Sequence, residues 1–199
     1  MTASKLRIDI RGLEKSFGEE RVLKGLDLSL SSGNFYCLMA PSGTGKTTLL
    51  RLLMGLEAPD RGTMTIRLSP DGPLRTAAVF QEDRLLEGYT ALQNLRFATG
   101  NRYTAEELTG FILRLLPEEA LNKPVREFSG GMRRRTAILR AILAPSDLVL
   151  MDEPFTGLDH ETKLSAIRMI REFCDGKLFI AATHAEEDPK LLGAKVIRL

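Results

Sequence analysis

The most constraining feature of this sequence is an apolar run, Phe35 to Ala40, which stops at Pro41. A glycine-rich loop follows, and a helical pattern opens at Thr47 and ends near Gly55. A continuous apolar run is typical of a strand inside a parallel sheet, because helices cover both faces of such sheets. The order of strand, phosphate-sized loop and helix therefore predicts an α/β protein with an anion site where a buried strand ends.

The remaining patterns extend this α/β plan. Residues 6–10 and 26–30 alternate apolar and polar side chains, so we expect them to form an antiparallel β edge layer. Further strands are expected at 63–68, 76–80, 147–151, 177–182 and 196–199, and helices at 91–97, 104–116, 133–143 and 161–173. Thr104 and Glu107 match a capping box. Strands that alternate with helices favour a mostly parallel core sheet.

Length and composition predict one domain over residues 1–199. Residues 1–82 and 145–199 form the expected core, and residues 83–144, where strand signals fade, form an inserted helical subdomain. Lysine and arginine total 28 against 26 acidic residues, and the net charge of +2 predicts no nucleic-acid partner. The sequence has charges near its start and no apolar run of about 18 residues. These features predict a chain that is not secreted and does not span a membrane by itself.

The glycine-rich loop has the composition of a P-loop. Backbone N–H groups of the loop and of the following helix stabilise phosphate oxygens, and glycines let the backbone approach them closely. Lys46 supplies positive charge and Thr47 a magnesium ligand. The usual pattern begins with glycine where this chain has Ala40, which requires that this residue has no positive φ. The candidate nucleotide-binding residues are Ala40, Pro41, Ser42, Gly43, Thr44, Gly45, Lys46, Thr47 and Thr48.

An acidic pair follows a second buried strand. Four apolar residues, 148–151, deliver Asp152 and Glu153 to the carboxyl end of that strand, beside the expected position of the loop. A nucleotide's magnesium needs carboxylate help, and a hydrolytic water needs a base. We therefore expect Asp152 to reach Mg²⁺ through water and Glu153 to orient the attacking water.

A second glycine-bearing helix start, Phe128-Ser129-Gly130-Gly131-Met132, narrows the class. Here the sequence resembles the ATP-binding cassette (ABC) family, whose signature usually reads Leu-Ser-Gly-Gly-Gln, so that Phe128 and Met132 are variants. The resemblance covers essentially the whole chain. It also predicts three features that occur in the expected order, namely Gln81, the turn Gly157-Leu158-Asp159 and His184.

The resemblance implies a head-to-tail pair of cassettes, with ATP and Mg²⁺ held between the P-loop of one and the signature of the other. Ser129, Gly130 and Gly131 present a hydroxyl, bare amides and a positive helix end, which are suitable donors for a γ-phosphate. By the same resemblance, Asp159 lies across the pair and Phe17 stacks under adenine. The catalytic residues implied are Glu153, His184, Gln81 and Lys46, and the metal ligands are Thr47, Gln81 and Asp152.

The partner that uses the ATPase is a separate question. The segment after Gln81 resembles that of bacterial importer cassettes for nitrate, sulfonate and related small anions. The resemblance implies a peripheral subunit on the cytoplasmic face of the membrane, bound to permease subunits and to a second cassette, with a solute-binding protein as a further member of the complex. The alternative is a soluble mechanochemical ATPase that acts on an iron–sulfur scaffold or a division complex. Substrate, direction of transport and homodimer versus heterodimer stay open.

Three further features, an arginine run, a histidine and the two cysteines, receive structural interpretations. Consecutive residues of a helix point in different directions, so we expect Arg133-Arg134-Arg135 to form a solvated face with one or two local salt bridges. His160 is interpreted as a turn residue. Cys37 and Cys174 have no paired spacing that indicates a disulfide or a zinc site, and Cys37 is interpreted as a small core hydrophobe.

Overall fold

The structure, a computed structural model, describes residues 5–41 and 43–199. Its strands are β1 (Lys5–Phe17), β2 (Glu20–Ser31), β3 (Asn34–Met39), β4 (Arg61–Ser69), β5 (Thr76–Val79), β6 (Leu148–Asp152), β7 (Leu178–Thr183) and β8 (Lys195–Arg198). Its α-helices are α1 (Lys46–Leu53), α2 (Ala91–Thr99), α3 (Ala105–Leu113), α4 (Gly130–Leu143), α5 (His160–Phe173) and α6 (Asp188–Leu192). Two 3₁₀ turns occupy Glu118–Ala120 and Val125–Glu127.

Five parallel strands form the core sheet, in the order β5-β6-β7-β3-β8. Every residue of β6 and β7 is buried, as their almost entirely apolar sequences require. Successive side chains point to opposite faces of the sheet. Val149 and Met151 therefore join the core on one face, whereas Leu148 and Leu150 join the core on the other. The mostly parallel core sheet predicted from the sequence is confirmed.

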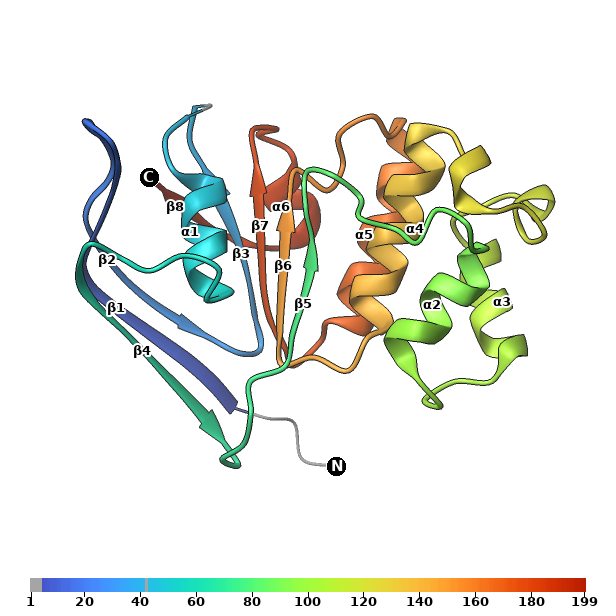
Figure 1. The fold of residues 1–199 in the computed structure, drawn as a ribbon, viewed down its shortest axis with the longest axis horizontal. Helices are drawn as coiled ribbons and strands as arrows, with labels where there is room; N and C mark the ends of the chain where they lie inside the picture. Colours follow the sequence, from blue (N-terminus) through green and yellow to red (C-terminus); the bar gives the residue numbers. More distant parts are fainter. Residues whose placement is uncertain (1–4, 42) are drawn as a thin grey trace.

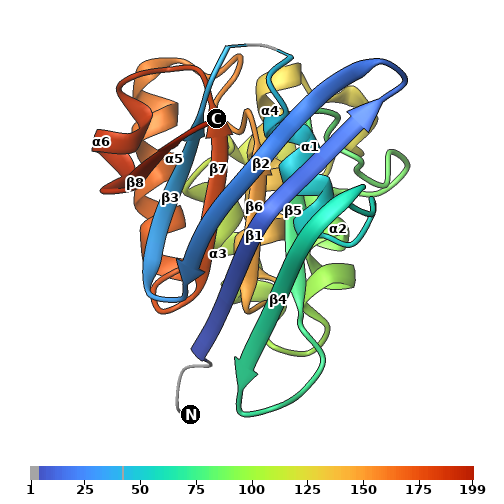
Figure 2. The ribbon, with the colours of Figure 1, turned by 90° about the vertical axis from the view of Figure 1, so that its left-hand side faces the viewer.

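A second, antiparallel sheet has the order β2-β1-β4 and forms the outer face seen in Figure 2. Ile8 and Ile10 of β1 are completely buried, and they pack in the same cluster as Leu49 and Leu52 of α1, which lies between the two sheets (Figure 1). The predicted edge layer is therefore confirmed. Its strands extend beyond the expected 6–10 and 26–30, because the β1–β2 pairing continues through register shifts to the tip of the hairpin.

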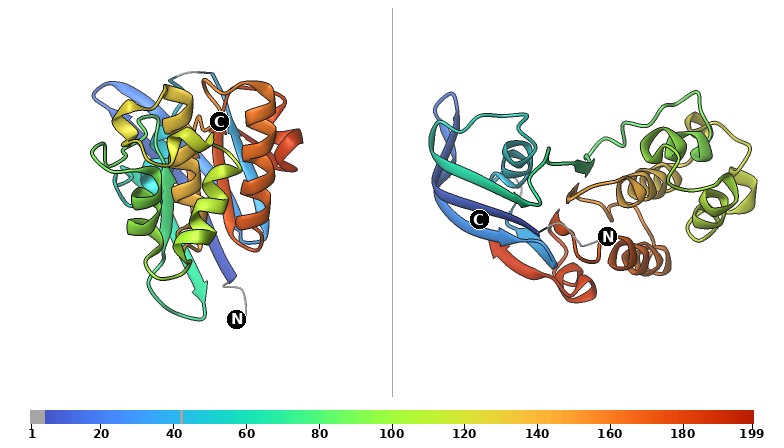
Figure 3. Two further views of the ribbon diagram at one scale, coloured as in Figure 1. Left: turned by 90° about the vertical axis from the view of Figure 1, so that its right-hand side faces the viewer. Right: turned by 90° about the horizontal axis from the view of Figure 1, so that it is seen from below.

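Helices cover the other face of the core sheet. α4 and α5 lie against the sheet, and α2 and α3 lie outside them (Figures 1 and 3). Thr104 and Glu107 form the predicted capping box of α3. The helix ends at Leu113 rather than at the predicted 116, and Pro117 disfavours helical backbone at the residue before it.

Several local features differ from the sequence interpretation or go beyond it. A second capping box, formed by Thr90 and Gln93, starts α2, and the short helix α6 was not predicted. His160, interpreted as a turn residue, is the first residue of α5. Cys37 is buried in the core, as expected. Within residues 5–41 and 43–199, no helix is long and apolar enough to cross a membrane.

Candidate functional site: a phosphate pocket at the carboxyl edge of the sheet

The carboxyl ends of the parallel strands bring the predicted site residues together. β3 leads into the P-loop, β6 ends in the acidic pair, and β7 ends just before His184, all at the upper edge of the sheet in Figure 1. A cavity of about 330 Å³ opens there, lined by Glu20, Val22, Gly43, Gly45, Lys46, Thr47, Thr48, Gln81, Asp152 and Glu153. Eight of these ten residues were predicted from the sequence. Glu20 and Val22 were missed, because nothing local in the β1–β2 hairpin shows that it folds over the loop.

Gly45 fixes the turn from the P-loop into α1. Its φ of +96° lies in the region that favours glycine, and a Cβ there would meet side-chain atoms of Val22 and Leu23 at 2.8 and 2.9 Å. Among the described non-glycine residues only Arg84 and Glu153 have positive φ, so Ala40 meets the condition set for replacing glycine. Ser42, also predicted to bind nucleotide, lies outside the described residues.

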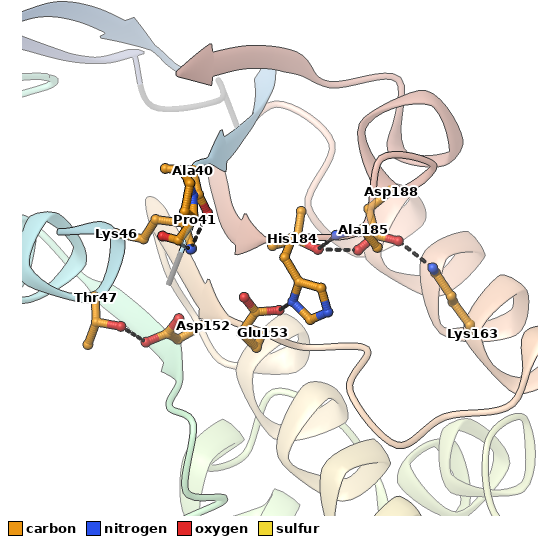
Figure 4. A network of polar contacts seen from close by, with 11 residues as sticks. Ala40, Pro41, Lys46, Thr47, Asp152, Glu153, Lys163, His184, Ala185 and Asp188 are labelled. Carbon is orange, nitrogen blue, oxygen red and sulfur yellow. Dashed lines mark hydrogen bonds and ion pairs between the residues drawn. The ribbon is translucent and has the colours of Figure 1, made fainter. Parts of the chain in front are cut away.

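Lys46 lies folded across the loop that it follows. Its Nζ donates hydrogen bonds to the carbonyl oxygens of Ala40 at 2.6 Å and Pro41 at 3.2 Å, and the residue is only 8% exposed (Figure 4). Thr44 also donates to the Pro41 carbonyl, at 2.6 Å. The ammonium group is therefore held at the mouth of the loop, where a phosphate oxygen can replace a carbonyl as its acceptor.

Thr47 and Asp152 form the candidate magnesium end of the cavity. The Thr47 hydroxyl donates to Oδ2 of Asp152 at 2.6 Å, and Asp152 is buried (Figure 4). Gln81 lines the same cavity. A hydroxyl, a carboxylate and an amide oxygen are hard oxygen donors of the kind that Mg²⁺ prefers, and Mg²⁺ commonly binds through one or two carboxylates plus substrate phosphates. The donor set therefore fits a nucleotide-bound magnesium ion.

Glu153 and His184 meet next to this cavity. Nδ1 of His184 lies 2.9 Å from Oε2 of Glu153, and the histidine side chain is 71% exposed against 20% for the glutamate (Figure 4). Glu153 has a φ of +47°, an uncommon backbone conformation for a residue with a Cβ. Its N–H donates to the carbonyl of Ala182 on the neighbouring strand at 2.9 Å, which holds this turn against the sheet.

A buried polar network supports the backbone on both sides of His184. The Thr183 hydroxyl donates to Oδ2 of Asp188 at 2.5 Å and accepts from the Ala185 N–H at 3.1 Å. Lys163 of α5 forms an ion pair with Asp188 (Figure 4). It forms a second ion pair, at 2.6 Å, with Glu187. Burial lowers the pKa of Lys163, but the hydrogen bonds to the two carboxylates outweigh it and the pKa is raised. This network was not predicted from the sequence, because its members come from separate elements.

The signature residues lie outside the cavity of their own chain. Ser129 is the N-cap of α4 and accepts a hydrogen bond from the Met132 N–H at 3.3 Å. Ser129 and Gly130 are exposed, and a Cβ on Gly131 would lie 3.5 Å from the carbonyl oxygen of Gly157. The signature and the Gly157-Leu158-Asp159 turn are thus adjacent, but neither lines the phosphate cavity.

Asp159 and Phe17 have local contacts in the single chain. Asp159 caps α5 by accepting from the Thr162 N–H at 2.9 Å and the Thr162 hydroxyl at 2.6 Å, and these bonds lower its pKa. Phe17 ends β1 at the hairpin tip, where it is 48% exposed and lies 5.4 Å from Nζ of Lys15. It does not line the cavity, so its stacking on adenine stays a prediction.

The interpretation of Arg133-Arg134-Arg135 as a solvated face is wrong for Arg134. Arg134 is only 8% exposed, and it donates to the carbonyl oxygens of Phe80 at 2.7 Å and Gln81 at 2.6 Å. Arg133 and Arg135 likewise donate to main-chain carbonyls. Arg134 reaches into the protein because its acceptors, the carbonyls of Phe80 and Gln81, lie outside helices and strands and need donors. Helical periodicity does not reveal such a contact between distant segments.

Three features define a P-loop nucleotide-binding protein of the cassette type. They are a P-loop after β3, an acidic pair after β6, from which β3 is separated by β7, and a second glycine-bearing helix start. The family model described as ABC transporter matches residues 23–156, and the chain belongs to this family. The resemblance inferred from the sequence motifs is therefore confirmed.

Curated relatives carry both import and export names. The chain is 42% identical over 205 residues to the aliphatic sulfonates import ATP-binding protein SsuB 1 of Nocardia farcinica, with 100% of this chain and 80% of the relative covered. It is 34% identical to the protein of the same name from Paraburkholderia xenovorans, with 98% and 58% covered. It is 35% identical to the Nod factor export ATP-binding protein I of Rhizobium sp. (strain N33), with 95% and 66% covered. The chain thus spans as little as 58% of the length of these relatives.

Solved structures of cassettes share the fold. The dimeric structure of a bacterial ABC transporter cassette superimposes with a TM-score of 0.78 at 27% identity, covering 96% of this chain and 94% of that chain. A dimeric post-hydrolysis state of that cassette bound to ADP and Pi superimposes with a TM-score of 0.79 at 25% identity, with the same coverage.

Proposed function

We propose that this chain is the ATPase subunit of a membrane transporter, and that it hydrolyses ATP as one of a pair of cassettes. The observation that carries the proposal is the separation of two half-sites within one chain. The cavity is lined by P-loop residues, Asp152 and Glu153, whereas Ser129 of the signature is exposed and does not line it. In a head-to-tail pair, the signature of each cassette would supply its donors to the phosphate cavity of the other cassette.

Each residue of the cavity then has a chemical task. Loop amides and the N-terminus of α1 bind phosphate oxygens, and Lys46 exchanges its carbonyl partners for them. Thr47, Asp152 and Gln81 would hold Mg²⁺, which neutralises charge on the phosphates when bound. Ser129 of a second cassette would donate to the γ-phosphate from the other side.

Glu153 and His184 act on the reacting water and the phosphate. The Glu153 carboxylate orients a water molecule and accepts its proton as the oxygen attacks the γ-phosphorus. The bond from that phosphorus to the bridging oxygen breaks, and ADP and inorganic phosphate leave. His184, held beside Glu153, contacts the γ-phosphate and keeps the carboxylate in place.

The transporter contact is proposed for the segment after β5 and for α2. Tyr89 and Phe97 form an edge-to-face pair with ring centroids 5.3 Å apart, although they are 44% and 63% exposed, and Leu86 is 46% exposed. Exposed apolar groups of this kind mark protein contacts. We assign them to permease subunits at the cytoplasmic face of the membrane, in a small-anion importer of the sulfonate or nitrate kind that includes a solute-binding protein.

One experiment tests the assignment. The tagged chain is expressed in its source cell and recovered from detergent-solubilised membranes, and its co-purifying proteins are identified; a Phe97→Asp variant serves as the matched control. A multi-span permease that co-purifies with the parent chain and is lost with the variant supports the proposal. Recovery of the chain from the soluble fraction with an iron–sulfur scaffold or division proteins contradicts it, and transport assays with sulfonates then decide substrate and direction.

A further inference from the structure

The segment that follows β5 is held by an arginine of the signature helix. Residues 80–84 form no helix or strand. Arg134 of α4 donates from its two terminal nitrogens to the carbonyls of Phe80 at 2.7 Å and Gln81 at 2.6 Å, and its Nε lies 3.2 Å from Oδ1 of Asp83. One buried guanidinium therefore contacts three of four consecutive residues.

A second arginine of the same helix continues this arrangement. Arg140 donates to the carbonyls of Arg84 at 2.7 Å and Asp83 at 3.2 Å. Backbone carbonyls outside a sheet need other donors, and the strand ladder of β5 ends at Val79. The backbone after β5 is thus fixed by α4 rather than by the sheet.

The contacts that the side chain at position 134 makes with the Phe80 and Gln81 carbonyls require an arginine. A guanidinium is planar and presents its N–H groups in a fixed fork, so two neighbouring carbonyls are bound in one defined arrangement. A lysine ammonium keeps the charge beside Asp83 but is a point donor that lacks this fork. The position of Gln81 relative to α4 therefore depends on the shape of the side chain at 134 as well as on its charge.

Arg134 lies between two parts of the proposed active site. On one side, Gln81 lines the cavity that also contains Thr47 and Asp152. On the other, Ser129, the N-cap of α4, precedes Arg134 by five residues, which is about 7.5 Å along the helix axis. The contact joins the magnesium end of the cavity to the helix whose tip faces a second cassette.

We propose that Arg134 is a positioning residue that sets the location of Gln81 and ties the magnesium end of the phosphate cavity to the signature helix. The proposal rests on the function proposed above. Displacement of α4 then moves the Gln81 carbonyl with it, so closure of the pair adjusts the metal-binding end of the cavity. Arg140 tethers the far end of the segment independently.

The test compares Arg134→Lys with a matched variant, Arg75→Lys. Arg75 also forms a two-pronged contact, with Asp147 at 2.9 and 3.1 Å, but it precedes β5 at the opposite end of the strand. The chain contains no tryptophan, so an added Glu82→Trp substitution gives a fluorophore that reports on this segment alone. Its anisotropy is measured without nucleotide. In a second measurement, Mn²⁺, a paramagnetic substitute for Mg²⁺, is added stepwise to the protein in the presence of a non-hydrolysable ATP analogue. Electron paramagnetic resonance then measures the affinity for Mn²⁺.

We expect Arg134→Lys to lower the fluorescence anisotropy. We also expect it to raise the Mn²⁺ concentration at half-saturation by about twofold to tenfold, which is the change in affinity that the loss of one hydrogen bond produces. Affinity for the analogue without metal stays within about twofold, and Arg75→Lys changes neither readout. Equal effects of both variants, or a changed anisotropy with unchanged Mn²⁺ affinity, overturn the proposal. If the parent chain binds no nucleotide, the proposed function fails, whereas the anisotropy still shows whether Arg134 orders the segment.

Discussion

Nδ1 of His184 lies 2.9 Å from Oε2 of Glu153, and the two residues come from the ends of neighbouring strands, β7 and β6. The histidine is largely exposed and the glutamate largely buried. The imidazole of the pair is thus open to solvent, while Glu153 lines the phosphate cavity. Glu153, the proposed base, is therefore distinct from the P-loop residues proposed to bind nucleotide.

Glu153→Gln separates these two steps. The amide keeps the shape of the carboxylate but does not accept the proton of water, so we expect turnover to fall by at least about a hundredfold while ATP binding persists. The trapped nucleotide should hold two chains together, which gel filtration with and without ATP detects. Glu118→Gln, at an exposed turn, is the control. Turnover that survives in Glu153→Gln removes this residue from the role of base.

Ser129→Ala tests the contribution of a second cassette to the site. Loss of one donor to a developing phosphate charge costs about 3 kcal/mol, so turnover should slow by about a hundredfold without change in ATP binding to the monomer. Thr104→Ala is the matched control, because it also removes a helix N-cap, at a cost of about 1 kcal/mol in stability. Similar ATPase rates in the two variants would show that Ser129 acts only as a cap.

Lys163→Met tests the network beneath His184. The substitution leaves the carboxylate of Asp188, which is 1% exposed, without its cation, and breaking a buried ion pair in this way costs about 3–5 kcal/mol. The free energy of unfolding is measured by urea titration. Lys163→Arg, which keeps the charge, should lose less than half as much. A loss below about 1 kcal/mol in Lys163→Met is the range of an exposed pair and contradicts this account.

The buried thiols predict a stability loss at alkaline pH. Burial raises the pKa of Cys37 to about 12, whereas an unfolded thiol titrates near pH 9. The unfolded chain therefore loses protons first, and stability present below pH 9 declines as pH rises toward 12, by about 1.4 kcal/mol per pH unit. Urea titrations at pH 8 and 10.5 should show a decline about 2 kcal/mol smaller in Cys37→Ala. Equal declines in the two proteins would contradict the assigned shift.

Local patterns predicted much of the fold and the cavity. Apolar runs identified the core strands because both faces of the sheet are covered, and the order of the glycine-rich and acidic motifs identified the family correctly. The spacing of Thr47 and Asp152 in the chain says nothing about distance, but both follow buried strands whose carboxyl ends meet at one edge. That rule is why the sequence placed them together.

Contacts between distant elements were not predictable in the same way. Arg134 lies in a run that reads as a solvated face, and it is buried because the carbonyls of Phe80 and Gln81 lack partners in the sheet. Lys163 and Asp188 look like ordinary surface charges until α5 and α6 bring them together. In both cases the side chain is buried because of a partner on another element. The periodicity of a helix or strand gives no information about such a partner.

The most direct test of the central claim is an experimental structure of the Glu153→Gln protein with ATP and Mg²⁺. The account predicts two chains in head-to-tail arrangement, with Oγ of Ser129 from one chain within about 3.2 Å of a γ-phosphate oxygen. That ATP should be bound by Lys46 of the other chain. A closed, ATP-loaded assembly in which Ser129 lies far from every γ-phosphate oxygen would contradict it.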